Sequence, residues 1–345
     1  MRNLSGEVVL VTGGAGYIGS HTVLALRDAG AEAVVLDDLS TGVREAVPAG
    51  VAFEPGSTLD REGLLRLLRR YGVTSVMHFA ASLIVPDSVA RPLAYYRNNV
   101  AGCLALAEAC AEAGIGRLIF SSTAAVYGEP AAVPVAETAP ALPLTPYGAS
   151  KLMAERILAD AAAAHGLDLA VLRYFNVAGA DPRGRAGQRT RSATHLVKVA
   201  AEVAAGRRPV LEIYGTDYPT PDGTCVRDYI HVADLVEAHL LLLGHLRRDG
   251  GRHLVNVGYG RGFSVREVVR AVERAAGRPL PLREAGRRPG DAARLVADAT
   301  LLRDRYGWRP SYDDIDTIVR SALDWERTLD AAPSDGRPRP AAGPG

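Results

Sequence analysis

The sequence has little of several features that would define a protein class. Its 345 residues include three cysteines, Cys103, Cys110 and Cys225, without a C-x-x-C spacing or a histidine cluster. This excludes a disulfide framework and a zinc site, and we predict reduced thiols and no metal. The formal net charge is only +1, which excludes a strongly basic nucleic-acid-binding surface. No apolar run approaches the length of about 18 residues that spans a membrane.

The N-terminal apolar run is short and ends in glycines, so it does not fit a signal peptide. Together with the reduced thiols, this predicts a cytoplasmic protein that binds neither nucleic acid nor membranes. The proportions of hydrophobic residues, 48%, and charged residues, 23%, are those of a globular protein.

Lysine is the scarcest of the charged residues. The chain has two, Lys151 and Lys198, against 38 arginines. Arginine carries a fixed charge on a planar group, whereas lysine is a compact point charge that can favour an ionised phenol beside it. Lys151 lies four residues after Tyr147, which would place both on one helix face. This spacing predicts a tyrosine–lysine pair for general acid–base chemistry, although the short pattern also occurs by chance.

A glycine-rich segment follows the first apolar run. Residues 8–12 are apolar and β-branched, which indicates a buried strand, and a helical pattern follows the glycines. Gly14, Gly16 and Gly19 satisfy G-x-G-x-x-G, whereas Gly13, Gly16 and Gly19 satisfy G-x-x-G-x-x-G. Either spacing permits a tight turn and lets the backbone approach a pyrophosphate at the helix N-terminus. The context predicts a dinucleotide-binding site.

The second predicted strand ends in two acidic residues, Asp37 and Asp38. An acidic residue about this far beyond the glycines binds the adenosine ribose hydroxyls of a dinucleotide. A carboxylate there would repel a 2′-phosphate, so we predict NAD and not NADP. The alternative is an ordinary glycine turn with a solvated acidic loop.

Apolar runs alternate with helical patterns along the first half of the chain. Alternation at this spacing predicts an α/β fold with a doubly wound, Rossmann-type parallel sheet. The predicted strands are 7–12, 32–37, 51–54, 74–79, 117–122 and 169–174, and the predicted helices include 60–71, 92–113 and 147–165.

The composition changes after about residue 175. Residues 176–192 are rich in Gly, Arg, Asp and Pro, which indicates a surface loop. We predict an NAD-binding domain over 1–175, to which later segments at about 226–257 return. We also predict a smaller α/β substrate-binding lobe over 176–330. Residues 331–345 have too little apolar surface to fold and are predicted to be disordered.

The fifth predicted strand ends in Ser121, Ser122 and Thr123. Ligands bind at the carboxyl ends of strands in doubly wound sheets. Thr123 is therefore a candidate to hydrogen-bond a substrate alcohol beside Tyr147. The alternative is that these hydroxyl residues only terminate a strand.

These motifs together resemble the extended short-chain dehydrogenase/reductase family. Within it, residues 213–232, Arg173–Ala180 and Arg287–Asp291 resemble the family of UDP-glucose 4-epimerases. The resemblance runs from about Val8 to Trp325. It implies reversible, NAD-dependent interconversion of UDP-glucose and UDP-galactose through a 4-keto intermediate. Tyr147 would move the proton of the 4-hydroxyl, Lys151 would lower the pKa of Tyr147, and Thr123 would bind the hydroxyl.

The residues after Thr123 disfavour two related activities. The related dehydratases and decarboxylases use acidic residues in this area, whereas this sequence has Ala124 and Ala125. Alanine cannot move a proton, so hydride removal and return is the chemistry that remains.

The resemblance also implies the residues that contact each ligand. NAD would contact Gly13, Gly16, Tyr17, Ile18, Gly19, Asp37, Asp38, Ser57, Thr58, Phe79, Ala80, Asn98, Ser121, Tyr147, Lys151, Tyr174 and Phe175. The UDP-sugar would contact Thr123, Asn176, His195, Leu196, Tyr214, Arg227, Arg288, Asp291 and Leu295. Ser57 and Leu83 depart from the residues common in the family, where aspartate and lysine contact the cofactor.

Three further expectations follow. The resemblance implies a homodimer formed through the helices at about 92–113 and 147–165. By the same resemblance, Leu295 stands at the position where residue size controls acceptance of N-acetylated sugars in the family. The alternative is therefore a 4-epimerase for another UDP-sugar, such as an N-acetylhexosamine, glucuronate or xylose. A non-catalytic NAD-sensing protein would lack a catalytic residue, whereas Thr123, Tyr147 and Lys151 are all present.

Overall fold

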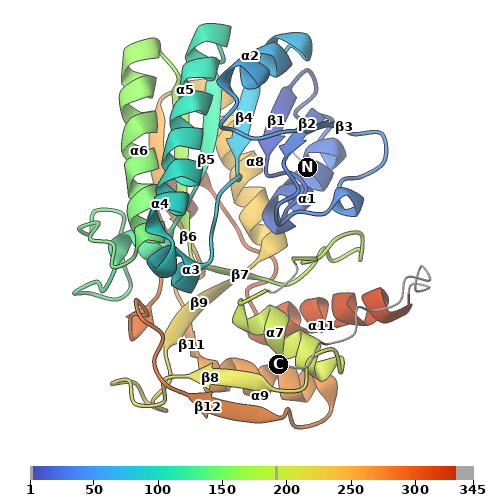
Figure 1. Cartoon of the computed structure of the whole chain (residues 1–345), viewed down its shortest axis with the longest axis vertical. Coiled ribbons are helices and arrows are strands. Elements are labelled where there is room, and N and C mark those ends of the chain that lie inside the picture. Colours follow the sequence, from blue (N-terminus) through green and yellow to red (C-terminus); the bar gives the residue numbers. More distant parts are fainter. Residues whose placement is uncertain (1–2, 191–192, 332–345) are drawn as a thin grey trace.

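The computed structural model describes residues 3–190 and 193–331. Figure 1 shows a large upper part built on a parallel sheet and a smaller lower part with shorter strands. The predicted disordered tail, 331–345, lies outside the described residues except for Ala331, where the last helix ends.

A seven-stranded sheet forms the centre of the larger part. Its order is β10-β6-β5-β4-β1-β2-β3, and every neighbouring pair is parallel. The predicted doubly wound parallel sheet is therefore confirmed. The strands are β1 (Val8–Thr12), β2 (Glu32–Asp37), β3 (Ala52–Pro55), β4 (Ser75–His78), β5 (Arg117–Thr123), β6 (Asp168–Tyr174) and β10 (Arg252–Val257).

Helices cover both faces of this sheet because alternate strand residues point to opposite faces. Val9 and Val11 belong to the core shared with α1 and α8, whereas Leu10 belongs to the core shared with α2, α5 and α6. The bounds are α1 (Tyr17–Asp28), α2 (Arg61–Arg70), α5 (Gly102–Ala113), α6 (Pro146–His165) and α8 (Val232–Asp249).

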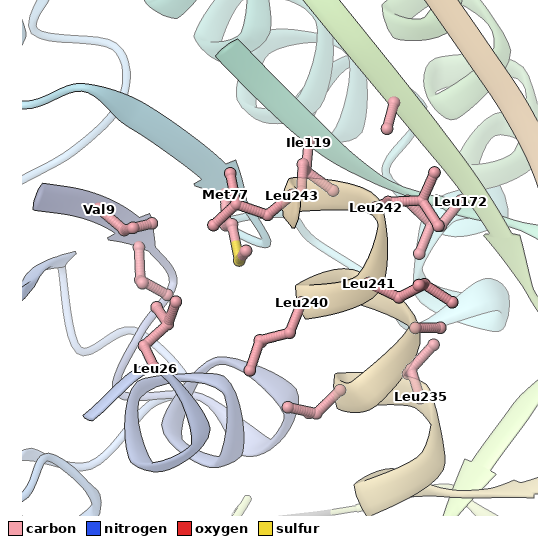
Figure 2. Close-up of a cluster of buried hydrophobic side chains, with 14 of the residues drawn as sticks. Val9, Leu26, Met77, Ile119, Leu172, Leu235, Leu240, Leu241, Leu242 and Leu243 are labelled. Carbon is pink, nitrogen blue, oxygen red and sulfur yellow. The ribbon is translucent and has the colours of Figure 1, made fainter. Parts of the chain in front are cut away.

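Helix α8 is apolar on nearly all sides of its middle section. Leu240, Leu241, Leu242 and Leu243 are consecutive and all buried. Figure 2 shows these leucines near Met77, Ile119 and Leu172 of the sheet and near Leu26 of α1. A helix that is hydrophobic all round is stable only when it is enclosed, and α8 is enclosed between α1 and the sheet.

A second, four-stranded sheet lies in the smaller part, with β9 at its centre. β9 pairs in parallel with β7 and β13 and antiparallel with β11, and β8 pairs in parallel with β12 in a separate ribbon. The bounds are β7 (Asn176–Ala178), β8 (Leu211–Tyr214), β9 (Val226–His231), β11 (Gly262–Ser264), β12 (Leu282–Ala285) and β13 (Arg294–Leu295).

Helices α7 (Leu196–Ala204), α9 (Val265–Ala276) and α11 (Ile315–Ala331) enclose a separate hydrophobic core in the smaller part. The segment 226–257 divides between the two parts. β9 lies in the second sheet, whereas α8 covers the large sheet and β10 forms its edge.

The helix predicted over 92–113 is interrupted. α4 (Pro92–Tyr95) continues into a π-helical segment (Tyr96–Ala101) before α5 begins. The sequence pattern also missed α3 (Val85–Ala90) and α10 (Thr300–Tyr306). These helices are too short for a periodic pattern to identify.

Candidate functional site

A cavity of about 570 Å³ lies where the carboxyl ends of the large sheet meet the second sheet. It is lined by every residue predicted to be catalytic or to contact the cofactor. The predicted substrate residues that line it are Thr123, Asn176, His195, Arg227, Asp291 and Leu295. Leu196, Tyr214 and Arg288 do not line it.

The glycine loop, residues 13–19, closes tightly on the end of β1. Gly13 has a φ of +72°, and a Cβ there would lie 2.7 Å from the Ala80 nitrogen. A Cβ on Gly19 would lie 2.2 Å from the Gly13 carbonyl oxygen. Gly13, Gly16 and Gly19 line the cavity, whereas a Cβ on Gly14 would meet Val35. The loop surface is therefore bare backbone at these positions.

The N-terminus of α1 opens onto this loop. Its N-cap, Gly16, makes no side-chain cap, and the first turn has no acidic residue. The helix therefore keeps unpaired N–H groups and a partial positive charge at this end. Such an end suits a diphosphate, and the bare glycine backbone leaves room for it. The local structure fits a dinucleotide.

Asp37 ends β2 beside the glycine loop and is buried. Its Oδ2 accepts a hydrogen bond from the Ala15 nitrogen at 2.9 Å, and its Oδ1 accepts one from the Leu39 nitrogen at 2.8 Å. Burial raises its pKa, and these two hydrogen bonds act in the opposite direction. The carboxylate braces the loop, and its remaining lone pairs can accept from ribose hydroxyls. Asp38 is exposed.

Tyr147 lies in the first turn of α6, where the Thr145 side chain accepts a hydrogen bond from the Gly148 nitrogen at 3.3 Å. Burial raises the pKa of Tyr147 to about 12, and a hydrogen bond with Thr123 acts in the opposite direction. The cap and the strand end thus bring Tyr147 and Thr123 together at the cavity.

Lys151 is buried one helical turn after Tyr147, and its Nζ donates to the Ser121 carbonyl oxygen at 2.9 Å. Burial lowers its pKa to about 8, and Cys103 and Glu155 act in the opposite direction. The hydrogen bond to Ser121 fixes the ammonium at the end of β5. The lowering of the Tyr147 pKa by Lys151 stays a prediction.

The second sheet contributes charged residues to the opposite wall. Arg227 of β9 and Asp291 form an ion pair with 3.5 Å between Nη2 and Oδ1. Leu295 of β13 is buried beside Arg227, its register partner. Arg288 instead stacks over the Tyr214 ring, 3.7 Å from its centroid.

Gln188 is a cavity residue that the sequence analysis missed. Its side chain is buried and pairs with His195, with 2.9 Å between Nε2 and Nδ1. Burial lowers the pKa of His195 and so favours a neutral ring. Gln188 lies in the polar segment 176–192, whose composition indicates only a surface loop. No sequence signal separates it from that loop.

Within the described residues, no group of three or more His, Cys, Asp or Glu side chains could hold a metal ion. Cys103, Cys110 and Cys225 are buried and unpaired with one another. None of the described helices has the length and hydropathy needed to cross a membrane.

Residues 9–258 match the NAD dependent epimerase/dehydratase family. The chain is 61% identical to the UDP-glucose 4-epimerase of Azospirillum brasilense over 93% of this chain and 92% of that protein. The UDP-glucose 4-epimerase of Bifidobacterium longum, solved in complex with NAD⁺ and UDP, superimposes with a TM-score of 0.90. It is 37% identical over 94% of this chain and 99% of that one.

The UDP-Glc/GlcNAc 4-epimerase of Campylobacter jejuni has a TM-score of 0.81. It is 45% identical over 94% of this chain and all of that one (100%). The glycine loop, the tyrosine–lysine pair and the agreement along nearly the whole chain lead to one conclusion. This chain belongs to the NAD dependent epimerase/dehydratase family.

Proposed function

We propose that this chain is a UDP-glucose 4-epimerase that uses NAD and interconverts UDP-glucose and UDP-galactose through a 4-keto intermediate. The observation that carries the proposal is that one cavity joins the glycine loop, the Tyr147–Thr123 pair and Arg227. The similarity to named UDP-glucose 4-epimerases supports the same substrate.

The glycine loop and the α1 N-terminus would hold the diphosphate of NAD, and Asp37 would hold its adenosine ribose. NAD bound there would supply a reversible hydride acceptor for a sugar carbon. Asp37 also supports NAD over NADP, because a carboxylate would repel a 2′-phosphate.

Tyr147 would take the proton of the 4-hydroxyl as phenolate and return it after the keto sugar has turned over in the cavity. Because its pKa is raised, little of Tyr147 is phenolate at neutral pH before the substrate binds. Thr123 would bind the same hydroxyl, and the Lys151 ammonium would favour the ionised phenol as proton transfer proceeds. Ala124 and Ala125 line the cavity without proton-transfer groups, which supports simple hydride removal and return.

Arg227 would bind the diphosphate of the UDP-sugar, because a guanidinium suits phosphate oxygens. Its partner Asp291, together with Asn176 and His195, would complete the nucleotide and sugar contacts. The UDP-sugar contacts predicted for Leu196, Tyr214 and Arg288 rest on the resemblance alone. We also propose the division into an NAD-binding part, 1–175, to which α8 and β10 of the segment 226–257 return, and a mainly substrate-binding part over the rest of 176–330.

Conversion of UDP-galactose to UDP-glucose by the purified protein without added NAD tests the proposal directly. We expect turnover with co-purified cofactor, because hydride is returned in each cycle. Turnover that appears only after NAD is added would keep the chemistry and implicate Ser57 and Leu83 in weak retention. No conversion with added NAD would contradict the assignment to UDP-glucose.

The second candidate substrates are a pair of UDP-N-acetylhexosamines that differ at the 4-hydroxyl. Leu295 lines the cavity, and its side chain is intermediate in size. The likeness to the UDP-Glc/GlcNAc 4-epimerase of Campylobacter jejuni favours testing it. A panel of UDP-sugars assayed with the same preparation would measure kcat/KM for each pair.

We further propose a cytoplasmic homodimer, with contacts through α4, α5 and α6. These neighbouring helices expose Leu93, Leu104 and Met153, whose exposed fractions are 76%, 46% and 47%. Exposed apolar side chains on neighbouring helices favour a protein interface when they form one patch.

We expect light scattering after gel filtration to give twice the chain mass. Leu93→Arg should shift the protein toward monomer, because a buried unpaired charge opposes association. The exposed Leu282, on β12, offers a control: Leu282→Arg should leave the mass unchanged. A monomeric wild-type protein would contradict the proposed dimer.

A further inference from the structure

A buried ion pair lies close to the Tyr147–Thr123 pair. Arg173 donates to both carboxylate oxygens of Glu155, with Nη2 2.6 Å from Oε2 and Nε 2.9 Å from Oε1. The Ser122 hydroxyl also donates to Oε1. The charged side chains are each 7% exposed. Two-point, charge-assisted hydrogen bonds of this kind fix orientation as well as charge.

Glu155 shares a helix face with the predicted catalytic residues. It lies on α6 four residues after Lys151 and eight after Tyr147. Side chains at this spacing project from the same side of a helix. Tyr147, Lys151 and Glu155 therefore lie in a row along α6. Glu155 is bonded to the sheet through both of its carboxylate oxygens.

The partners of Glu155 lie at the strand ends that border the cavity. Ser122 and Arg173 are register partners on β5 and β6. Ser122 lies between Ser121, whose carbonyl holds Lys151, and Thr123, which hydrogen-bonds Tyr147. The ion pair thus joins α6 to β5 and β6 beside the chain segment that orients both predicted catalytic side chains of the helix.

Glu155 is the carboxylate among the groups that act on the pKa of Lys151. Among the groups around this lysine, burial raises the pKa of Cys103 to about 12 and lowers that of His78 to about 3. Both are therefore neutral at neutral pH, whereas Glu155 is paired as a carboxylate with Arg173. The Glu155 charge raises the Lys151 pKa against the effect of burial. Tyr147 and Tyr174 are further titratable side chains near Lys151.

We propose that Glu155 is a positioning residue for the epimerase reaction. It holds the α6 face against the strand ends through Arg173, and its carboxylate helps to keep Lys151 in the ammonium form. The inference rests on the proposed function, because it gives Lys151 and Tyr147 their roles in proton transfer.

Glu155→Gln removes the charge and keeps the size of the side chain. We expect kcat to fall roughly ten- to a hundred-fold, because small displacements of catalytic groups cost about that much, with little change in KM. The alkaline limb of the pH–activity profile should also move to lower pH than in the wild type. A lysine with a lowered pKa loses its ammonium form earlier as pH rises.

Glu7→Gln is the matched control. Glu7 is a buried carboxylate that accepts from Arg117, Thr74 and Ser75 directly before β1, at the opposite end of the strands. Both variants should lower the Tm, since each removes the charge of a buried carboxylate that is paired with an arginine. Only Glu155→Gln should lower kcat and move the alkaline limb of the pH profile.

The two lysines permit a readout that does not depend on turnover. Nuclear magnetic resonance of protein containing isotope-labelled lysine gives one set of signals for Lys151 and one for Lys198, which a Lys198→Arg variant assigns. The pKa of Lys151 is expected at about 8 in the wild-type protein. This pKa should fall in Glu155→Gln and stay unchanged in Glu7→Gln. This result is interpretable even if the UDP-galactose assay fails.

Arg173→Lys distinguishes the positioning role of Glu155 from the effect of its charge. It also replaces Glu155→Gln as the test of the positioning role if that variant does not fold. It keeps a positive partner and loses the two-point hydrogen bond. We expect kcat to fall while the alkaline limb stays in place. An unchanged kcat in this variant would overturn the positioning role. A Lys151 pKa that does not move in Glu155→Gln would overturn the charge role.

Discussion

Tyr147→Phe is expected to lower kcat about a thousand-fold, within the range that general acid–base groups contribute. The change removes the phenolic oxygen that hydrogen-bonds Thr123 and keeps the aromatic ring. The α6 N-terminus should persist, because its cap is the Thr145 side chain. The measurements are steady-state turnover of UDP-galactose and calorimetric binding of UDP. The affinity for UDP should stay near the wild-type value.

Tyr306→Phe is the matched control for this prediction. Tyr306 is buried, and its hydroxyl pairs with His253 at 2.9 Å, away from the residues that line the cavity. This variant should lose a little stability and keep its turnover. Turnover near the wild-type value in Tyr147→Phe would contradict the assignment of Tyr147 as the proton-transfer group.

Gly19→Ala is expected to weaken NAD binding by roughly thirty-fold or more, which corresponds to an overpacking cost of about 2 kcal/mol. The new Cβ would lie 2.2 Å from the Gly13 oxygen and 2.8 Å from the Gly14 Cα. Both atoms belong to the backbone, so the loop itself must move. That movement would displace the N–H groups that are to bind the diphosphate.

The content of NAD in the purified protein and titration of NAD into the stripped protein measure this effect. Gly116→Ala is the control, because a Cβ at Gly116 meets no atom within 4 Å and its φ lies outside the region that requires glycine. Retention of NAD by Gly19→Ala at the wild-type level would show that the glycine loop does not bind the diphosphate.

The sequence predicted the large sheet well because most of its strands are short apolar runs buried on both faces. Predicted strand 32–37 coincides with β2, and predicted strand 117–122 differs from β5 by one residue. The glycine motif left two spacings open. The structure distinguishes them, since Gly13 faces the cavity and Gly14 packs on Val35.

The smaller part was harder to predict because its strands are short and its contacts are distant in sequence. β13 has two residues, Arg294–Leu295, and depends on β9 for its pairing. Gln188 reaches the cavity only because its loop turns back toward His195. The hydrogen bond from Lys151 to the Ser121 carbonyl also depends on how α6 packs against β5. No spacing of residues in the sequence specifies that packing.

The chain crosses between the two parts more than once, and this limits how the protein can be divided. The large sheet takes its edge strand β10 and its covering helix α8 from residues beyond the first segment of the smaller part. A fragment ending at residue 175 would expose the apolar face that α8 covers. Exchange of the sugar-binding part between homologues would therefore need several junctions, and a single crossover at residue 175 would also replace part of the NAD-binding scaffold.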